Sequence, residues 1–366
     1  MGLLTHSSFI MSPDSLSFLK NLLSTPSPSG FELEGQRVWK SRVAPIADKI
    51  ESDAYGNLFV HLNPGRTPRI VITGHSDELG LMISHISDEG FLFFTGIGGV
   101  DRTLLKGQRV TIHTKKGPVR GVIGSLAIHL QEPDDRKKSP EFHELFIDIG
   151  ASSKNEAAQL VRIGDPATIA SDVWELSGSR LAARGCDNRI GTWTAAETLH
   201  LLSKNKSQLQ TEVVAVSTIQ EENGLYGATM ASYRIHPSIV VAVDVTHATD
   251  IPICTKSKHG ETRLGAGPVI SRGSANHPLL VERFIHVAEK NKIPYQLEAN
   301  PRSTGTDADA FFIQKGGMPT ISLGLPNRYM HSPVEVIDLD DLDALAQLIA
   351  AFCLSVTNME EFYPAV

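Results

Sequence analysis

At 366 residues the chain exceeds one typical folding unit, so we expect a large domain and a second, smaller one. Hydrophobic residues make up 41% and charged residues 20%, as in ordinary folded proteins outside membranes. The net charge of −7, without any basic run, argues against a nucleic-acid partner. No apolar run approaches the ~20 residues that span a bilayer, so we expect no membrane partner either.

The cysteines and the start of the chain favour a cytoplasmic location. Cys186, Cys254 and Cys353 are widely separated, which predicts neither a disulfide framework nor a structural zinc ribbon. The segment MGLLTHSSFIMSPDSL has no positively charged start and no long apolar core, so it does not resemble a secretory signal. We therefore expect a cytoplasmic protein.

Segments with helical periodicity alternate with short apolar runs, which predicts an α/β fold. In SPDSLSFLKNLL, Ser12 is a suitable N-cap and Pro13 a suitable first helical residue, so the first helix is expected to begin there. A second helix is predicted in FELEGQRVWKSRVAPIA, and strands follow in NLFVHLN and RIVITGH.

Between residues 79 and 171 the pattern changes to short strands with interspersed glycines. The runs GLMISHI, GFLFFTGI, QRVTIHT and PVRGVIGSLAI succeed one another, and no long helix is indicated before SSKNEAAQLV. This pattern is typical of a small β-rich unit. We therefore predict an α/β domain in two parts, residues 1–78 and 172–366, interrupted by a β-rich domain at residues 79–171.

After residue 171 the alternation of helices and strands resumes. Helices are predicted in NRIGTWTAAETLHLL, GLYGATMASY, PLLVERFIHVAEKN and LDDLDALAQLIAAFCL. Strands are predicted in TEVVAVSTI, SIVVAVDV, YQLEA and PTISLGL. Because ligand sites in open α/β sheets form at strand ends, the polar residues that follow these strands are candidates for chemistry.

Two histidines and several carboxylates stand at such ends: His75, Asp77, Asp187, Glu221, Glu222, Asp244 and His331. Imidazole and carboxylate ligands suit zinc, and a shared carboxylate can bridge two ions about 3.5–4 Å apart. Two residues apart in an extended segment, His75 and Asp77 share a face, so Asp77 could accept the second N–H of His75. Taken singly, each residue is better explained as a hydrogen-bonded histidine, a capping aspartate or a solvated acidic turn.

Six motifs occur together: TGHSDELGLMI, GCDNRIG, QEENGLYGA, DVTHA, GTDADA and YMHSPVEV. In this order they resemble the tetrahedral-aminopeptidase family of dinuclear metallopeptidases, which includes glutamyl and deblocking aminopeptidases and proteins labelled as cellulase M-like. The resemblance extends to PSPSGFE near the start and to LFIDIGASSKNEAAQLVRIGDPATI in the middle. It therefore covers nearly the whole chain.

The resemblance implies a role for each candidate residue. One divalent ion would be held by His75, Asp187 and Asp244. The other would be held by Asp187, Glu222 and His331, so that Asp187 is the bridge. Glu221 would be the general base and Asp77 the partner that orients His75. Zinc would be the metal, with cobalt or manganese as alternatives.

The resemblance also implies an aminopeptidase-type α/β sandwich with a mixed central sheet and a PDZ-like insertion used in dimerisation. The assembly would be a dimer-based homo-oligomer, up to a dodecamer, and the reaction would remove the N-terminal residue of short peptides. A strained or cis Asp187–Asn188 peptide is expected by the same analogy. Adjacent residues leaving a strand point to opposite sides, so Glu222 is expected to face the metals and Glu221 the substrate.

Three other functions remain open on the sequence. A dinuclear amidohydrolase would use the same residues to remove acyl groups from small molecules. A catalytically inactive binding scaffold would be indicated by a missing ligand or base, and none is missing. A glucanase would need two carboxylates and no metal.

Overall fold

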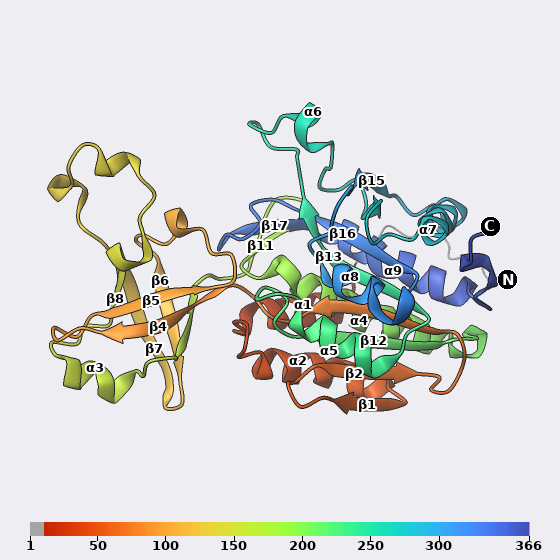
Figure 1. The fold of residues 1–366 in the computed structure, drawn as a ribbon, viewed down its shortest axis with the longest axis horizontal. Coiled ribbons are helices and arrows are strands. Elements are labelled where there is room, and N and C mark those ends of the chain that lie inside the picture. The colour runs from red at the N-terminus through yellow and green to blue at the C-terminus, as the bar shows by residue number, and fades with distance from the viewer. Residues whose placement is uncertain (1–10, 366) are drawn as a thin grey trace.

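Two sheets of different kinds organise the computed structural model, which describes residues 11–365 (Figure 1). One is an eight-stranded mixed sheet, and the other is a closed six-stranded barrel at the left of the view. Among the described residues, no helix is both long and apolar enough to cross a bilayer. The segment in which we expect no secretory signal begins in residues 1–10, outside the described part of the chain.

The central sheet has the strand order β1-β2-β12-β3-β13-β16-β14-β15. Its strands are β1 (Lys49–Ser52), β2 (Leu58–Leu62), β3 (Arg69–His75), β12 (Glu212–Thr218), β13 (Ile239–His247), β14 (Val269–Arg272), β15 (Gln296–Ala299) and β16 (Thr320–Asn327). The four middle strands, β12, β3, β13 and β16, are parallel. Because β2 and β14 join them in antiparallel pairs, the sheet is mixed, as predicted.

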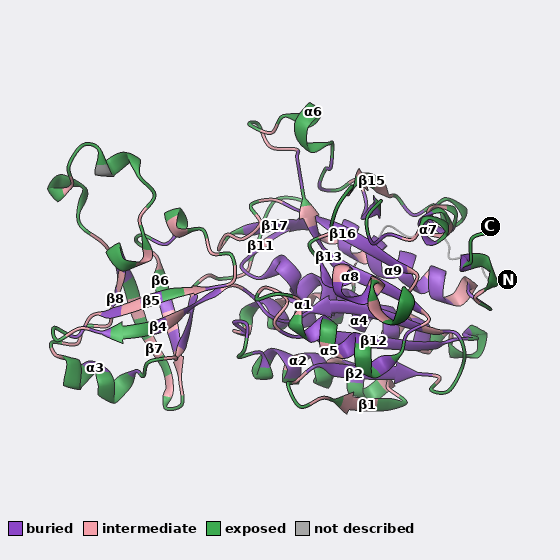
Figure 2. Cartoon of the chain, viewed as in Figure 1, coloured by how far each residue is buried: buried purple, intermediate pink, exposed green. Residues whose placement is uncertain are grey.

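Helices cover both faces of this sheet. One face packs on α1 (Pro13–Ser24), α2 (Leu33–Val43), α4 (Cys186–Lys204), α7 (Pro278–Asn291) and α9 (Leu339–Ser355), and the other on α5 (Tyr226–Ile235) and α8 (Asp307–Phe312). In β12, Val213 and Ala215 belong to the first core, whereas Val214 and Val216 belong to the second. This alternation follows from the two-residue period of a strand and explains its burial on both sides (Figure 2).

The first predicted helix begins where the sequence indicates. The Ser12 hydroxyl accepts a hydrogen bond from the Ser15 backbone N–H at 3.2 Å, and Pro13 is the first residue of α1. The other long helices and strands predicted after residue 171 are also present. The short strands β1, β14 and the three-stranded sheet of β10 (Trp174–Glu175), β11 (Arg180–Ala183) and β17 (Glu335–Asp338) have no clear signal in the sequence.

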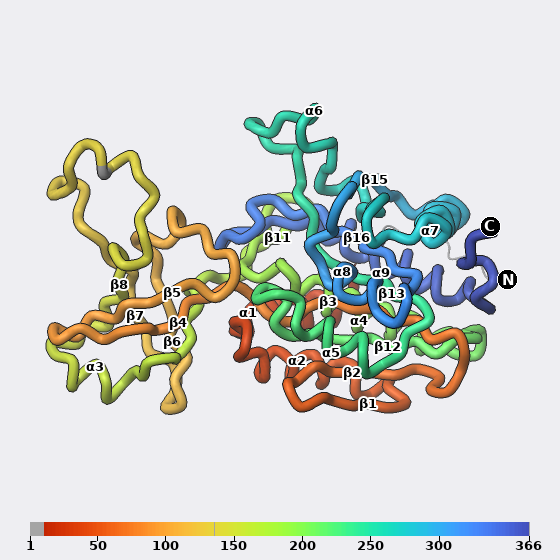
Figure 3. Tube along the Cα trace, in the orientation of Figure 1, coloured from red at the N-terminus to blue at the C-terminus, as the bar shows by residue number. Residues whose placement is uncertain are grey.

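The barrel closes in the order β4-β5-β8-β7-β6-β9. Its strands are β4 (Gly80–Ile86), β5 (Leu92–Ile97), β6 (Arg109–Thr114), β7 (Gly117–Gly124), β8 (Phe146–Asp148) and β9 (Pro166–Ile169). It has a hydrophobic core of its own and carries α3 (Lys154–Leu160) outside. The chain between β7 and β8 loops away from it, and α6 (Lys256–His259) lies on a second projecting segment (Figure 3). The β-rich pattern is thus explained, while the domain boundaries at 79 and 171 stay a prediction.

Close packing of α4 against β3 determines the geometry of the sheet edge. A Cβ atom on Gly74 would lie 2.4 Å from the Gly191 carbonyl carbon, so neither position leaves room for a side chain there. The helix can therefore approach the strand closely. As a result Asp187, in the first turn of α4, lies beside His75, the last residue of β3.

Candidate metal centre

The predicted residues lie where the parallel strands end. His75 closes β3, Asp244 lies in β13, and Glu221 and Glu222 follow β12. Asp187 starts α4, and His331 follows β16. Carboxyl ends of neighbouring parallel strands meet at one edge of a sheet, which is why residues far apart in the chain converge here.

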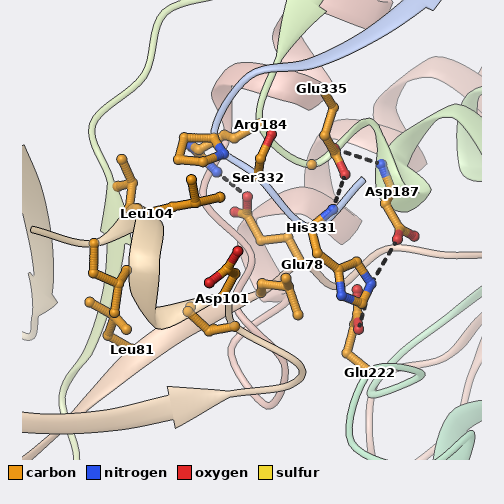
Figure 4. Close-up of a pocket in the computed structure, with 17 residues that line it drawn as sticks. Glu78, Leu81, Asp101, Leu104, Arg184, Asp187, Glu222, His331, Ser332 and Glu335 are labelled. Atoms are coloured by element: carbon orange, nitrogen blue, oxygen red, sulfur yellow. Dashed lines mark hydrogen bonds and ion pairs between the residues drawn. The ribbon is translucent and has the colours of Figure 1, made fainter. Parts of the chain in front are cut away.

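Two histidines face the two oxygens of one carboxylate. The His75 Nε2 atom is 3.2 Å from Asp187 Oδ1 and 3.9 Å from Asp244 Oδ1. The His331 Nε2 atom is 3.2 Å from Asp187 Oδ2 and 3.8 Å from Glu222 Oε2 (Figure 4). Among the described residues, three groups have ligand atoms within 4.8 Å of one another: His75–Asp187–Asp244, Asp187–Glu222–His331 and His75–Glu221–Glu222. The first two are the triads that share Asp187.

The environment of these residues fits divalent cations. His75, Asp187 and Asp244 are buried, and among the described residues the buried Oε1 atom of Glu222 has no hydrogen-bond partner. Burying several unpaired carboxylates is unfavourable unless cations offset their charge. Imidazole and carboxylate together suit zinc and similar transition metals. The donor set therefore fits two cations that share Asp187.

The crowding of charge shifts the pKa values within the site. Burial, and then the charge of Asp187, raises the pKa of Glu222 to about 8. Burial also raises the pKa of Asp244 well above its ordinary value. Burial acts on Asp187 in the same direction, but hydrogen bonds from His331 and His75 outweigh it and lower the pKa of Asp187. The hydrogen bond to Asp187 raises the pKa of His331 to about 9. Without bound cations, some side chains of this cluster would thus be protonated near neutral pH.

Asp77 connects His75 to the loop that follows β12. Its Oδ1 atom is 3.3 Å from His75 Nδ1, and its backbone carbonyl is 3.2 Å from the same nitrogen. The same carboxylate accepts hydrogen bonds from the Glu221 N–H at 3.0 Å, the Glu222 N–H at 3.2 Å and the Ser29 hydroxyl at 2.7 Å. Asp77 therefore contacts His75 and both glutamates, and its hydrogen bonds to the glutamate backbone were not predicted.

The expectation that Glu221 and Glu222 point to opposite sides is wrong. Strand β12 ends at Thr218, and Gln220 has a positive φ of 49°, so the chain turns before the glutamates. Ligand atoms of Glu221, Glu222 and His75 lie within 4.8 Å of one another. Both carboxylates thus face the cluster, because the alternation of an extended strand no longer applies to them.

The Asp187–Asn188 peptide bond is cis, as expected. The Asn188 side-chain amide donates to the Val243 carbonyl at 2.7 Å, and its oxygen accepts from the Gly191 N–H at 2.9 Å. Asn188 therefore ties the start of α4 to β13, the strand that carries Asp244.

Two further residues bond to the cluster and a third acts on it through its charge, and none of the three was predicted. Glu335 in β17 accepts hydrogen bonds from the Asp187 N–H at 3.1 Å and the His331 N–H at 3.0 Å. The Gly99 carbonyl lies 3.2 Å from His331 Nδ1. Asp307 accepts hydrogen bonds from two buried threonine hydroxyls, and its charge helps to raise the pKa of Glu221, after burial, to about 8. Glu335 and Asp307 lie in recognisable motifs, whereas nothing near Gly99 indicates its contact.

Comparisons with known proteins identify the family of this chain. The family model described as M42 glutamyl aminopeptidase matches residues 56–348. A lysyl aminopeptidase of Pyrococcus furiosus is 34% identical over 347 residues, which cover 93% of this chain and 97% of that protein. A TET aminopeptidase from a marine sediment thaumarchaeote has a TM-score of 0.91 at 32% identity, covering 95% of this chain and 98% of that one.

A second structural relative is described by its assembly. The TET1 peptidase of Pyrococcus horikoshii, which can assemble into a tetrahedron or a large octahedral shell, has a TM-score of 0.83 at 35% identity. The match covers 93% of this chain and all of that one, 100%. The family model and the relatives together span both the central sheet and the barrel. The chain therefore belongs to the M42 family of tetrahedral aminopeptidases and is a metallo-aminopeptidase.

Proposed function

We propose that the chain removes the N-terminal residue from short peptides with two divalent cations at the edge of the central sheet. The observation that carries this proposal is the position of Asp187, whose two oxygens face His75 and His331 at 3.2 Å each. A carboxylate in that position can be shared by two cations. With a single cation, one histidine and the carboxylate next to it would have no metal to bind.

The first cation would be held by His75, Asp187 and Asp244, and the second by Asp187, Glu222 and His331. Zinc is our first choice, with cobalt or manganese as alternatives, because the ligand types do not separate them. When bound, the two cations would lower the pKa of a water molecule and polarise the carbonyl of the scissile peptide bond.

Glu221 is the residue left to move protons. It belongs to neither of the two triads that share Asp187, although its Oε2 atom is 3.7 Å from His75 Nε2. Its carboxylate would accept a proton from the attacking water and pass it to the nitrogen of the departing amine. The backbone bond from its N–H to Asp77 would hold it in place for both transfers.

Substrate and assembly follow from the family. By analogy with the family, the free α-amine of the peptide would bind at the metal centre, which would restrict cleavage to the terminal residue. By analogy with the shells formed by its relative from P. horikoshii, the chain would form a dimer-based homo-oligomer, up to a dodecamer. The barrel, as a PDZ-like inserted domain, would mediate dimerisation. A cytoplasmic location is part of the same proposal.

Chelation distinguishes this reaction from glycoside hydrolysis. Exhaustive removal of divalent metal should abolish hydrolysis of aminoacyl-p-nitroanilides, and adding back zinc, cobalt or manganese should restore it. The reason is that the protein's own groups cannot polarise the carbonyl without a Lewis acid. A stripped protein that remains active would contradict the metal mechanism, and activity on β-glucans would favour two carboxylates acting alone.

The variant Glu221→Gln tests the proton-transfer role. It should retain two metals per chain by elemental analysis and lose about 10²–10⁴-fold in kcat, the usual contribution of general acid–base catalysis. The amide keeps the shape of the side chain but cannot take a proton. A variant with near-normal kcat would disprove the role, and one with a single metal would make Glu221 a ligand instead.

The variant Glu335→Gln tests whether the carboxylate orients Asp187 and His331. Loss of one of its two acceptor oxygens should weaken metal binding by about 10–100-fold, measured by competition with a chelator. Asp341→Asn is a matched control, because Asp341 is also buried and accepts two backbone N–H groups, those of Gly265 and Gly267, away from the site. Equal metal affinity in both variants would refute the orienting role.

A further inference from the structure

A cavity of about 60 Å³ opens beside the candidate metal centre. Asp187, Glu222 and His331 form one side of it. The opposite side is apolar, as the close-up shows for Leu81 and Leu104 (Figure 4). The remaining apolar side chains of the lining are Leu79, Val100, Leu105, Ile169 and Pro333. A substrate side chain that extends from the metal centre into this cavity would therefore enter a hydrophobic space.

The barrel supplies most of this apolar wall. Leu81 lies in β4 and Ile169 in β9, while Leu104 lies in the 3₁₀ helix Arg102–Leu104 between β5 and β6. The loop that leads to this helix is held against the centre, since the Gly99 carbonyl is 3.2 Å from His331 Nδ1. A Cβ atom on Gly98 would lie 3.2 Å from the Glu222 Cβ, so the loop also packs directly on a proposed ligand. The wall and the ligands thus form one continuous structure.

The charged groups around the cavity are already paired or hydrated. Glu78 forms ion pairs with Arg184 and, at 2.8 Å, with Arg189, so both of its oxygens are engaged. Asp101 is exposed and accepts hydrogen bonds from the Thr103 N–H at 2.9 Å and the Thr103 hydroxyl at 2.6 Å. Water screens such an exposed carboxylate, which makes an ion pair with it weak.

We propose that this cavity receives the side chain of the substrate's N-terminal residue and selects an uncharged aliphatic one, leucine or methionine. The inference rests on the proposed function. The size of the cavity supports the proposal. A water-sized sphere needs about 10–15 Å³, so the cavity holds a short aliphatic chain of a few heavy atoms. A glutamate carboxylate would lose its hydration in this apolar space, because Arg184, which also lines the cavity, is already paired with Glu78. A lysine ammonium would lose its hydration in an apolar space with only a screened partner.

The first experiment compares aminoacyl-p-nitroanilides on the metal-loaded enzyme. The kcat/KM for the leucyl and methionyl substrates should exceed that for the glutamyl and lysyl substrates by about tenfold or more, the usual range for discrimination in an apolar pocket. Glutamyl or lysyl turnover at or above the leucyl value would overturn the inference while leaving the aminopeptidase function intact. If no aminoacyl substrate is cleaved, the proposed function fails and this inference fails with it.

Leu104→Arg tests the wall itself. Leu104 is 37% exposed, so the charge can be accommodated on the surface, and Leu160 in α3, 44% exposed, gives the matched control Leu160→Arg. Leu104→Arg should lower leucyl kcat/KM by about tenfold or more and raise the glutamyl-to-leucyl ratio, whereas the control should match the wild type. An unchanged ratio in Leu104→Arg would place the substrate side chain elsewhere.

Binding of free amino acids gives a readout that does not depend on turnover. In calorimetric titrations of the metal-loaded protein, L-leucine should bind at least about tenfold more tightly than L-glutamate or L-lysine, and Leu104→Arg should remove that preference. Equal affinities for the three amino acids in the wild type would overturn the inference even if catalysis favoured leucine.

Discussion

The burial of several carboxylates at one edge of the sheet is the constraint on which the rest of the structure depends. Asp187, Asp244 and Glu222 lie within reach of two histidines and largely out of contact with water. Like charges in such a place are unfavourable without cations, which is reflected in the raised pKa of two of these carboxyls. The fold therefore creates a concentration of negative charge that bound cations would balance, and the surrounding contacts hold that concentration in place.

Two carboxylates outside the proposed ligand set hold the segments that carry the ligands together. Asp77 joins the end of β3 to the loop after β12, and Glu335 joins the start of α4 to the loop after β16. Each therefore ties together two segments that are distant in the sequence. The barrel takes part through Gly99, whose carbonyl lies next to His331. The barrel and its loops thus form part of the wall of the site, in addition to the dimerisation role that we propose for the barrel.

How much the sequence could predict depended on whether the signal was local. His75 and Asp77 could be predicted because an apolar run ends at them and a two-residue spacing places them on one face. The hydrogen bond from Asp187 to Glu335 and the contact of Gly99 with His331 could not be predicted, because they join residues 148 and 232 positions apart. The turn at Gln220 was also missed, since its positive φ occurs at a residue that gives no sign of it. Short strands such as β17 form through pairing and have no periodicity to detect.

The most direct test of the account is anomalous diffraction from crystals of the protein grown with zinc. The account predicts two peaks about 3.5–4 Å apart, one on each side of the Asp187 carboxylate. One would lie beside His75 and Asp244, and the other beside His331 and Glu222. A single peak, or two peaks that do not share Asp187, would contradict the claim that the sheet edge is built for a pair of cations.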